Sequence, residues 1–186
     1  MKKLITGAFM LCATVFYSQQ FLVTPHGLKS KSNPDHNYLV LKIENKTAKE
    51  LYTNALKYIN LNYKNPSGVV KAKIENEYLR FTTYAPAFIK VNNGGVKLKV
   101  SANYSIELKF KNNKVRFEIT ELELTADNGG RYVFFKGSVW KGYPIYNKKE
   151  KLRLPKTKLD LELYFNSQVL QILKQLQNQS TAEDDW

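Results

Sequence analysis

The sequence contains 186 residues, with 29 Lys or Arg, 16 Asp or Glu and a formal net charge of +13 at pH 7. A chain of this length suits one domain, which can bury about 70% of the surface that its unfolded chain exposes, and the charge favours anionic partners without bearing on the fold. A single cysteine excludes an intramolecular disulfide and any site held by several thiolates.

The first 18 residues have the pattern of a secretory signal peptide. Lys2 and Lys3 precede an apolar stretch from residue 4 to residue 16, and small or polar residues follow. The apolar stretch is well short of the roughly 20 residues that cross a bilayer. Cys12 lies inside this leader without the small preceding residue of a lipoprotein signal, so we expect neither an anchor nor lipidation. We predict export to the periplasm or the extracellular space, as a mature chain of net charge +11 after Lys2 and Lys3 are lost.

Residues 19–37 contain two prolines and both histidines, His26 and His36, but no sustained hydrophobic periodicity. This composition predicts a flexible lead-in. Alternation begins at Tyr38, so we expect a first strand over residues 38–43. It opens a single domain that extends to residue 178.

The segment from Thr47 to Tyr63 predicts an amphipathic helix. Thr47 and Glu50 have the spacing of a capping box, in which each side chain bonds an amide of the first turn. At about 100° per residue, one broad arc opposite lysines and asparagines comprises Ala48, Leu51, Tyr52, Ala55, Leu56, Tyr58, Ile59 and Tyr63. We interpret the arc as core that packs on a sheet rather than as a ligand surface. Residues 65–68 contain Pro and Gly and are expected to end the helix.

Antiparallel strands dominate the middle of the sequence. Residues 69–75 and 78–84 predict two strands around a short turn. Every even position of Val96–Phe110 is apolar, which indicates a strand with one wet face. A turn at Asn112-Asn113 would pair this strand with the next one and set Phe110 opposite Val115.

The apolar phase of that next strand slips after Ile119, which predicts a β-bulge near Thr120 and Glu121. A turn at residues 127–130 is then expected to lead to a sixth strand over residues 131–140.

A second helix closes the predicted domain. Thr157 and Asp160 can cap it. Its wide apolar face comprises Phe165, Val169, Ile172 and Leu176, with Leu159, Leu163, Leu170 and Leu173 beside them. Residues 179–186 form an acidic tail.

Few sequence features indicate catalysis. The sequence has no G-x-S-x-G, no phosphate loop ending in G-K-[ST] and no H-E-x-x-H. Glu118, Glu121 and Glu123 lie close together on one predicted strand and are candidates for acid–base work. We expect them to face water, and we predict no catalytic residue, no metal and no cofactor. A glycan-acting hydrolase that uses these carboxylates is the alternative.

Two segments are candidate binding sites. The first interleaves aromatic and cationic side chains that can grip sugars or bases, and its candidate residues are Arg131, Tyr132, Phe134, Trp140 and Tyr143. The second is a basic run whose candidates for binding a polyanion, such as a phosphorylated glycolipid, are Lys148, Lys149, Lys151 and Arg153. The competing interpretations are an edge strand that completes the core and a solvated loop before the last helix.

Four segments carry a resemblance to a known family: KELYTNALKYINLNYKNP, IENEYLRF, KVRFEITELEL and LELYFNSQVLQILKQL. They resemble a secreted bacterial domain of unknown function with a TATA-binding-protein-like (TBP-like) fold. The resemblance covers Tyr38 to about Leu124 and returns at the last helix. It implies an α+β fold in which a curved antiparallel sheet of about five or six strands carries two helices on one face, in the order β-α-β-β-β-β-α. It brings no catalytic residues, and residues 125–155 depart from its pattern.

The open face of this expected sheet carries Lys97, Lys99, Lys109 and Arg116. Export and the lack of apolar wedges on that face argue against DNA, so no nucleic acid is expected. We therefore hypothesise a non-enzymatic binding module of the cell envelope. Its partner would be an unknown envelope component or an anionic glycan or lipid.

Overall fold

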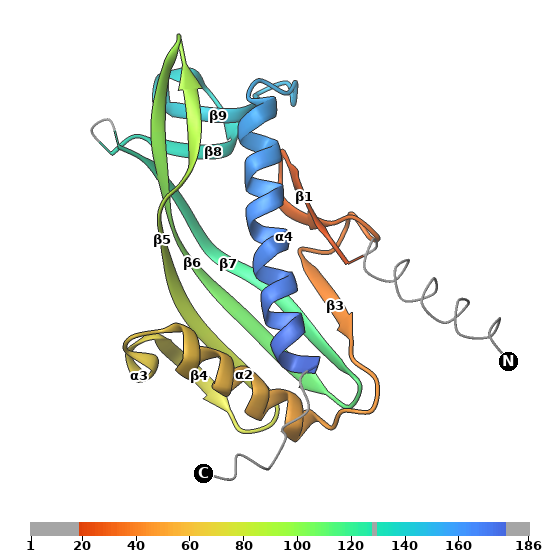
Figure 1. Cartoon of the computed structure of the whole chain (residues 1–186). Helices are drawn as coiled ribbons and strands as arrows, with labels where there is room; N and C mark the ends of the chain where they lie inside the picture. The colour runs from red at the N-terminus through yellow and green to blue at the C-terminus, as the bar shows by residue number, and fades with distance from the viewer. Residues whose placement is uncertain (1–18, 128–129, 178–186) are drawn as a thin grey trace, which may run out of the picture.

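The computed structural model describes residues 19–127 and 130–177. The predicted leader, the acidic tail and part of the turn at residues 127–130 lie outside these ranges. Figure 1 shows a long, bent sheet with the helices α2 (Ala48–Asn62) and α4 (Pro155–Gln177) on one of its faces. The predicted α+β class, with helices on one face of a curved sheet, is confirmed.

The main sheet has seven strands in the order β4-β5-β6-β7-β8-β9, and β3 pairs with β7 beside this path. The bounds are Tyr38–Lys42 for β3, Val70–Ile74 for β4, Tyr78–Asn93 for β5, Val96–Lys111 for β6, Lys114–Ala126 for β7, Tyr132–Gly137 for β8 and Gly142–Asn147 for β9. The sheet therefore has more strands than the five or six antiparallel strands that we expected. The unexpected strand is β9, which lies parallel to β8. Parallel neighbours usually need a long crossover, whereas here only residues 138–141 connect them.

The β6–β7 hairpin forms as predicted, with Phe110 paired to Val115 across the turn at residues 112 and 113. Even positions of β6 from Val100 onward are buried, but Val96 is exposed at the free end of the β5–β6 hairpin. The bulge is also confirmed, because the register shifts beyond residue 103 and Glu121 has a φ of +53°.

Helix α2 begins with the predicted capping box between Thr47 and Glu50. Its apolar arc lies on the sheet, where the rings of Tyr52 and Phe110 meet edge to face with centroids 5.6 Å apart. The tyrosines of this helix therefore belong to the core, as expected. Helix α2 ends at Asn62, before the predicted stop at residues 65–68, and Pro66 instead begins a short helix, α3 (Pro66–Val69).

Helix α4 begins earlier than predicted. Pro155 occupies its first turn, where a missing N–H costs nothing, and the N–H of Lys158 donates to the C=O of Leu154. Thr157 is thus inside the helix and buried rather than at its cap.

The apolar face of α4 is also narrower than predicted, since only one side of the helix touches the sheet. Its buried residues are Thr157, Leu161, Phe165, Val169, Ile172, Leu173 and Leu176. By contrast, Leu159, Leu163 and Leu170 are exposed, which corrects their assignment to the core. No helix in the described part of the chain has the length and apolar character needed to cross a bilayer.

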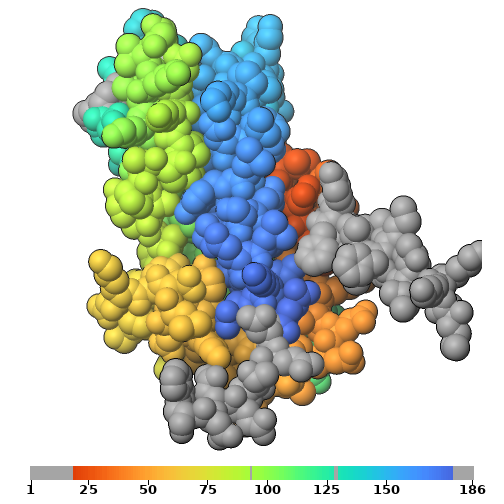
Figure 2. Space-filling view, in the orientation of Figure 1, coloured from red at the N-terminus to blue at the C-terminus, as the bar shows by residue number. Residues whose placement is uncertain are grey.

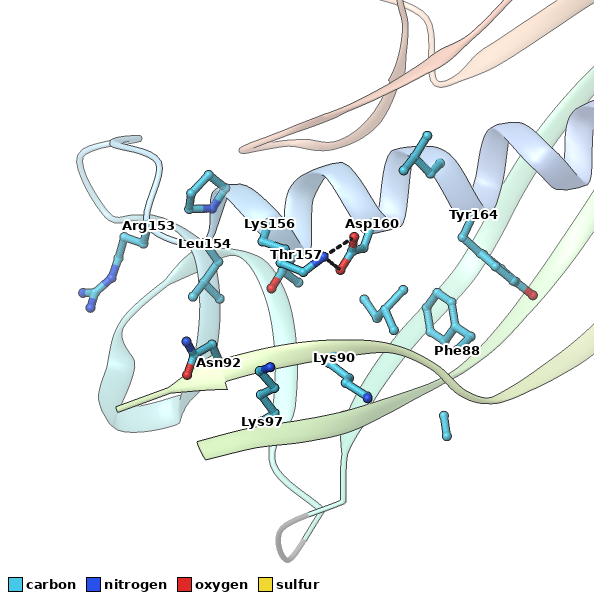
Figure 3. A pocket seen from close by; sticks show the side chains of 14 residues that line it. Phe88, Lys90, Asn92, Lys97, Arg153, Leu154, Lys156, Thr157, Asp160 and Tyr164 are labelled. Carbon is cyan, nitrogen blue, oxygen red and sulfur yellow. Dashed lines mark hydrogen bonds and ion pairs between the residues drawn. The ribbon is translucent and has the colours of Figure 1, made fainter. Parts of the chain in front are cut away.

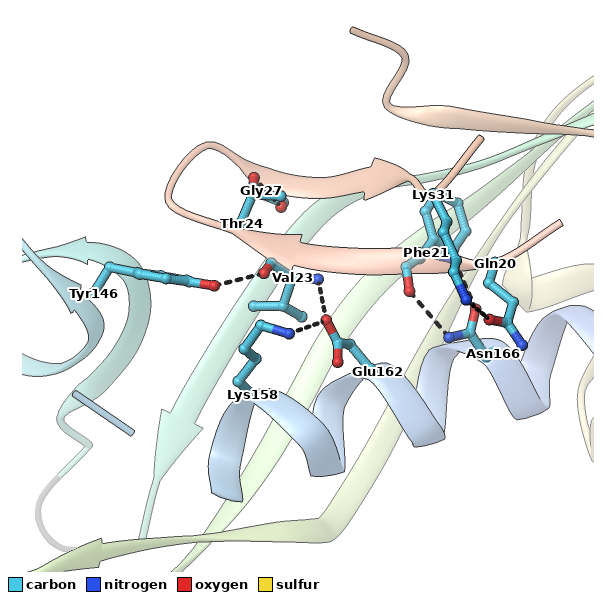
Figure 4. Close-up of polar contacts among 10 residues, drawn as sticks. All are labelled: Gln20, Phe21, Val23, Thr24, Gly27, Lys31, Tyr146, Lys158, Glu162 and Asn166. Atoms are coloured by element: carbon cyan, nitrogen blue, oxygen red, sulfur yellow. Dashed lines mark hydrogen bonds and ion pairs between the residues drawn. The ribbon is translucent and has the colours of Figure 1, made fainter. Parts of the chain in front are cut away.

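The flexible lead-in predicted for residues 19–37 is wrong. Strands β1 (Phe21–Thr24) and β2 (Gly27–Ser30) form a hairpin there, and Phe21, Val23 and Leu28 are buried. Figure 4 shows how α4 binds this hairpin: Asn166 and Glu162 bond the main chain of β1. The apolar alternation of this hairpin is too short to stand out in the sequence. The side chains that bond the hairpin to α4 lie about 140 residues away in the chain.

Candidate functional site

A groove opens between the outer half of the β5–β6 hairpin and the start of α4. We call residues 87–98 of this hairpin the arm. The groove has a volume of about 950 Å³, which lies within the range of small-molecule sites in proteins. Figure 2 shows it as the furrow between the yellow-green arm and the blue α4, and Figure 3 shows the side chains that line it.

A bulge in β5 creates the inner end of the groove. Pro86 has no N–H for the strand ladder, the register with β6 shifts across residues 85–89, and Ala87 has a φ of +48°. Phe88 consequently has no ladder partner and packs on α4, with its ring centroid 4.4 Å from that of Tyr164. The bulge therefore supplies an aromatic contact between the arm and the helix.

The floor of the groove is apolar. Its lining side chains are Phe88, Ile89, Leu154, Pro155, Leu163 and Tyr164. Leu163 is 62% exposed, so this part of the floor is apolar surface in contact with solvent. Such surface is released from water when an apolar group covers it.

Behind the floor, the hydroxyls of Tyr164 and Tyr104 lie 3.0 Å apart. Burial raises the pKa of Tyr104 far above its ordinary value, and the bond to Tyr164 raises it further. Tyr104 therefore stays protonated at any physiological pH, and the inner end of the groove carries no charge from this residue.

The rim of the groove is cationic, with Lys90 and Lys97 on the arm and Arg153 and Lys156 on the opposite side. Lys156 forms an ion pair with Asp160 at 3.0 Å. No ion pair among residues 19–127 and 130–177 involves Lys90, Lys97 or Arg153. The positive end of the α4 dipole also lies here, so the rim attracts anions.

The predicted aromatic site is only partly assembled. Phe134 and Trp140 line a shallow hollow of about 410 Å³ together with three lysines, Lys136, Lys141 and Lys148. Tyr143 is buried and thus unavailable to a ligand, which corrects its assignment as a binding residue. Arg131 and Tyr132 are exposed at the start of β8 but do not line the hollow.

The predicted basic run is dispersed in the same way. Lys148, Lys149, Lys151 and Arg153 are all exposed. Of these, Lys148 lines the hollow and Arg153 lines the groove, while Lys149 and Lys151 line neither. The run therefore supplies one cation to each of two different places.

The three candidate carboxylates lie on β7 and line neither the groove nor the hollow. Glu118 is buried and accepts from Arg116 at 2.6 Å, whereas Glu121 accepts from the hydroxyl of Ser105 at 2.7 Å. Glu123 is exposed beyond the bulge. This geometry gives the hydrolase hypothesis no support.

The two histidines line neither the groove nor the hollow. Within the described ranges, no cluster of three or more His, Cys, Asp or Glu could hold a metal ion. His36 stacks on Tyr38 with centroids 4.4 Å apart, and His26 lies 3.4 Å from Glu150.

Sequence reasoning missed Phe88, Lys90, Lys156 and Tyr164 as a group, because two segments far apart in the chain, β5 and α4, contribute them. Pro86 within an apolar stretch was the available signal, since it marks a break in a strand.

Comparisons with known proteins agree with this fold. Residues 38–125 match a family described as a domain of unknown function (DUF4468) with TBP-like fold. The crystal structure of a TBP-like protein from Parabacteroides distasonis ATCC 8503 is similar, with a TM-score of 0.52 and 12% identity over 76% of this chain and 91% of that chain. A DUF4468 family protein from Bacteroides ovatus ATCC 8483 gives a TM-score of 0.52 and 11% identity over 78% and 88% of the two chains. No curated protein matches the chain.

Proposed function

Residues 38–125 belong to the domain of unknown function DUF4468 with its TBP-like fold, and we propose that the protein uses this fold as a non-enzymatic binding module for an anionic amphiphile. The ligand would lie in the groove between the arm and α4. One observation carries the proposal: an apolar floor adjoins a rim on which Lys90, Lys97 and Arg153 have no ion pair among the described residues.

The apolar floor and the cationic rim of the groove each require a different part of the ligand. A purely polar anion would satisfy the rim but would leave Leu163 and the edge of Phe88 in contact with water. A neutral apolar molecule would cover the floor but would leave three cations unpaired. An anionic head on an apolar tail meets both requirements, because apolar burial and charge pairing then add.

The remaining groove chemistry supports binding rather than turnover. Asp160 is the carboxylate of the groove lining, and its two oxygens accept from Lys156 at 3.0 and 3.1 Å. Thr157 supplies a hydroxyl to the lining but is itself buried, whereas a catalytic nucleophile must be reached by its substrate and activated by a base. The predicted signal peptide would bring the module to the cell envelope, where anionic lipids are the corresponding partner class.

Isothermal titration calorimetry with single-chain probes below their micelle concentrations tests the proposal. Dodecyl phosphate should bind, whereas inorganic phosphate and neutral dodecyl maltoside should each bind at least about tenfold more weakly, since every tenfold corresponds to about 1.4 kcal/mol. Equal affinity for dodecyl maltoside would show that the rim is irrelevant. Equal affinity for inorganic phosphate would show that the floor is irrelevant.

Matched variants locate the site. Leu163→Asp adds a carboxylate to the floor and should abolish dodecyl phosphate binding, whereas Leu170→Asp on the same helix should not, because Leu170 is exposed but does not line the groove. Lys97→Glu should weaken binding, and Lys49→Glu, an exposed change on α2, is its control. Equal effects within either pair would place the ligand elsewhere.

The polyanion hypothesis makes a different prediction for the basic run. Because Lys148, Lys149 and Lys151 are exposed and lie outside the groove, replacing them with Gln should leave dodecyl phosphate binding unchanged. If the same replacements abolish both retention on a heparin column and dodecyl phosphate binding, the basic run rather than the groove is the anion site.

A further inference from the structure

Trp140 is the most solvent-exposed large hydrophobic residue among the described residues. It lies in the 3-10 turn η1 (Val139–Lys141), where 93% of Trp140 and 43% of Val139 are accessible to solvent. Tryptophan has the largest apolar surface of any side chain and is usually well buried. An apolar protrusion of this kind on a protein surface marks an interaction site.

The turn presents Trp140 on a fixed backbone. The ring of Phe134 covers Gly137 so closely that a Cβ there would lie 2.6 Å from it, and a Cβ on Gly142 would lie 2.3 Å from the carbonyl oxygen of Tyr132. The N–H of Lys141 also donates to the C=O of Ser138 at 3.1 Å. The backbone that carries the indole is therefore closely packed on both sides of the turn.

Lysines surround the indole. Lys136, Lys141 and Lys148 line the hollow beside Trp140. Lys136 is neutralised by Glu150 at 2.8 Å, and this bond lowers the pKa of Glu150. Lys141 and Lys148 form no ion pair within residues 19–127 and 130–177. Two unpaired positive charges thus flank an exposed tryptophan.

The hollow suits a lipid surface better than a sugar. Lysine only donates hydrogen bonds, and Ser138 is the remaining polar side chain of the lining. A neutral glycan would find too few acceptors for its hydroxyls. Tryptophan prefers the interface between lipid headgroups and acyl chains, and lysine is attracted to anionic lipids.

We infer that the turn around Trp140 docks the protein on an anionic lipid bilayer. Trp140 and Val139 enter the interface, and Lys141 and Lys148 meet the lipid phosphates. The inference goes beyond the groove, because it uses different residues and does not require the groove to hold a ligand. With two apolar side chains in the interface, the attachment is reversible.

Sedimentation with lipid vesicles tests the inference, using the protein from Gln19 onward as the predicted maturation leaves it. Vesicles of phosphatidylcholine with phosphatidylglycerol should sediment the protein, and vesicles of phosphatidylcholine alone should do so much less. Trp140→Ala should lower the affinity about tenfold. Lys141→Glu and Lys148→Glu should each lower it at least about fivefold, the factor that corresponds to about 1 kcal/mol per lysine.

Two controls separate docking from other effects. Tyr84→Ala removes an exposed aromatic residue elsewhere and should leave vesicle binding unchanged. In a Trp186→Phe background, the emission of Trp140 should shift to shorter wavelength with anionic vesicles. Trp140→Ala binding as tightly as the parent, or emission without a shift, would overturn the inference while leaving the proposed groove function intact.

Discussion

The side-chain amide of Asn166 bonds the main chain of Phe21 twice. Its Oδ1 accepts from the Phe21 N–H at 2.8 Å and its Nδ2 donates to the Phe21 C=O at 3.1 Å. Asn166 thus replaces the neighbouring strand that β1 lacks on its outer edge (Figure 4). Because an isolated two-stranded hairpin is marginally stable, α4 fixes the hairpin in place.

Asn166→Leu should therefore destabilise the protein by about 2 kcal/mol, because it leaves two buried main-chain groups of Phe21 without partners. The measurement is the free energy of unfolding in urea. Gln171→Leu, an exposed change on the same helix, is the matched control. A loss smaller than about 0.5 kcal/mol in Asn166→Leu would contradict the anchoring role.

A second prediction concerns the pair Arg116 and Glu118 on β7. The guanidinium of Arg116 lies 3.8 Å from the ring centre of Tyr38 and donates to Glu118 at 2.6 Å. Arg116→Met would leave a nearly buried carboxylate with Asn37 as its donor. We expect a loss of about 2 kcal/mol, between the values for exposed and buried pairs.

A double-mutant cycle isolates this pair. In the Glu118→Gln background, Arg116→Met should cost clearly less, since no charge is left unpaired. Lys99→Met, at an exposed position of β6, serves as the control for loss of positive charge. Additive effects of the two changes would show that the two side chains do not interact.

A third prediction follows from the buried tyrosines. Burial raises the pKa of Tyr58 to about 12 and raises that of Tyr104 further. Above pH of about 10 the unfolded chain loses these protons while the native protein keeps them. Stability should therefore be unaffected by these groups below pH 10 and should fall above it, by about 1.4 kcal/mol per pH unit for each tyrosine.

Urea unfolding at pH 8, 10 and 11 measures this slope, because these pH values bracket the ordinary tyrosine pKa of about 10. Tyr104→Phe should make the slope between the two higher values shallower, whereas Tyr84→Phe, at an exposed position, should not. Identical slopes in all three proteins would mean that Tyr104 ionises as easily in the native state as in the unfolded chain.

A fourth prediction concerns Gly142, which begins β9 with a φ of +148°. Gly142→Ala places a Cβ 2.3 Å from the carbonyl oxygen of Tyr132, so we expect a loss of about 3 kcal/mol. Gly95→Ala is the control, because Gly95 has a φ of +89° with nothing within 4 Å and should lose only about 1 kcal/mol. Equal losses would mean that the backbones of β8 and β9 are not in close contact at this point.

Local patterns in the sequence correctly predicted the features whose conformation is set by neighbouring residues. The capping box at Thr47, the alternation of β6 and the phase slip at Glu121 each report the conformation of their own segment, and all three are confirmed. The resemblance to the TBP-like family added the curvature of the sheet and the placement of both helices on one face.

Features that depend on distant partners could not be predicted in this way. The hairpin at Phe21 requires Asn166, and the parallel strand β9 requires the close contact of Gly142 with β8. The groove needs Phe88 from a bulge and Tyr164 from α4, two residues that are unremarkable in their own segments. The predicted aromatic site around Trp140 illustrates the converse. Trp140 and Tyr143 are close in sequence, but Trp140 is exposed and Tyr143 is buried in the core, so they do not form one site.

The last prediction addresses the leucines of α4. The sequence pattern placed Leu163 and Leu170 on the wide apolar face and left Leu161 out, yet Leu161 is buried and the other two are exposed. Leu161→Ala should cost about 3 kcal/mol through lost burial and the resulting cavity. Leu163→Ala and Leu170→Ala should each cost less than about 1 kcal/mol, measured by urea unfolding. If Leu163→Ala proved as costly as Leu161→Ala, its side chain would already be packed, and the floor of the groove would have no free apolar surface for a ligand.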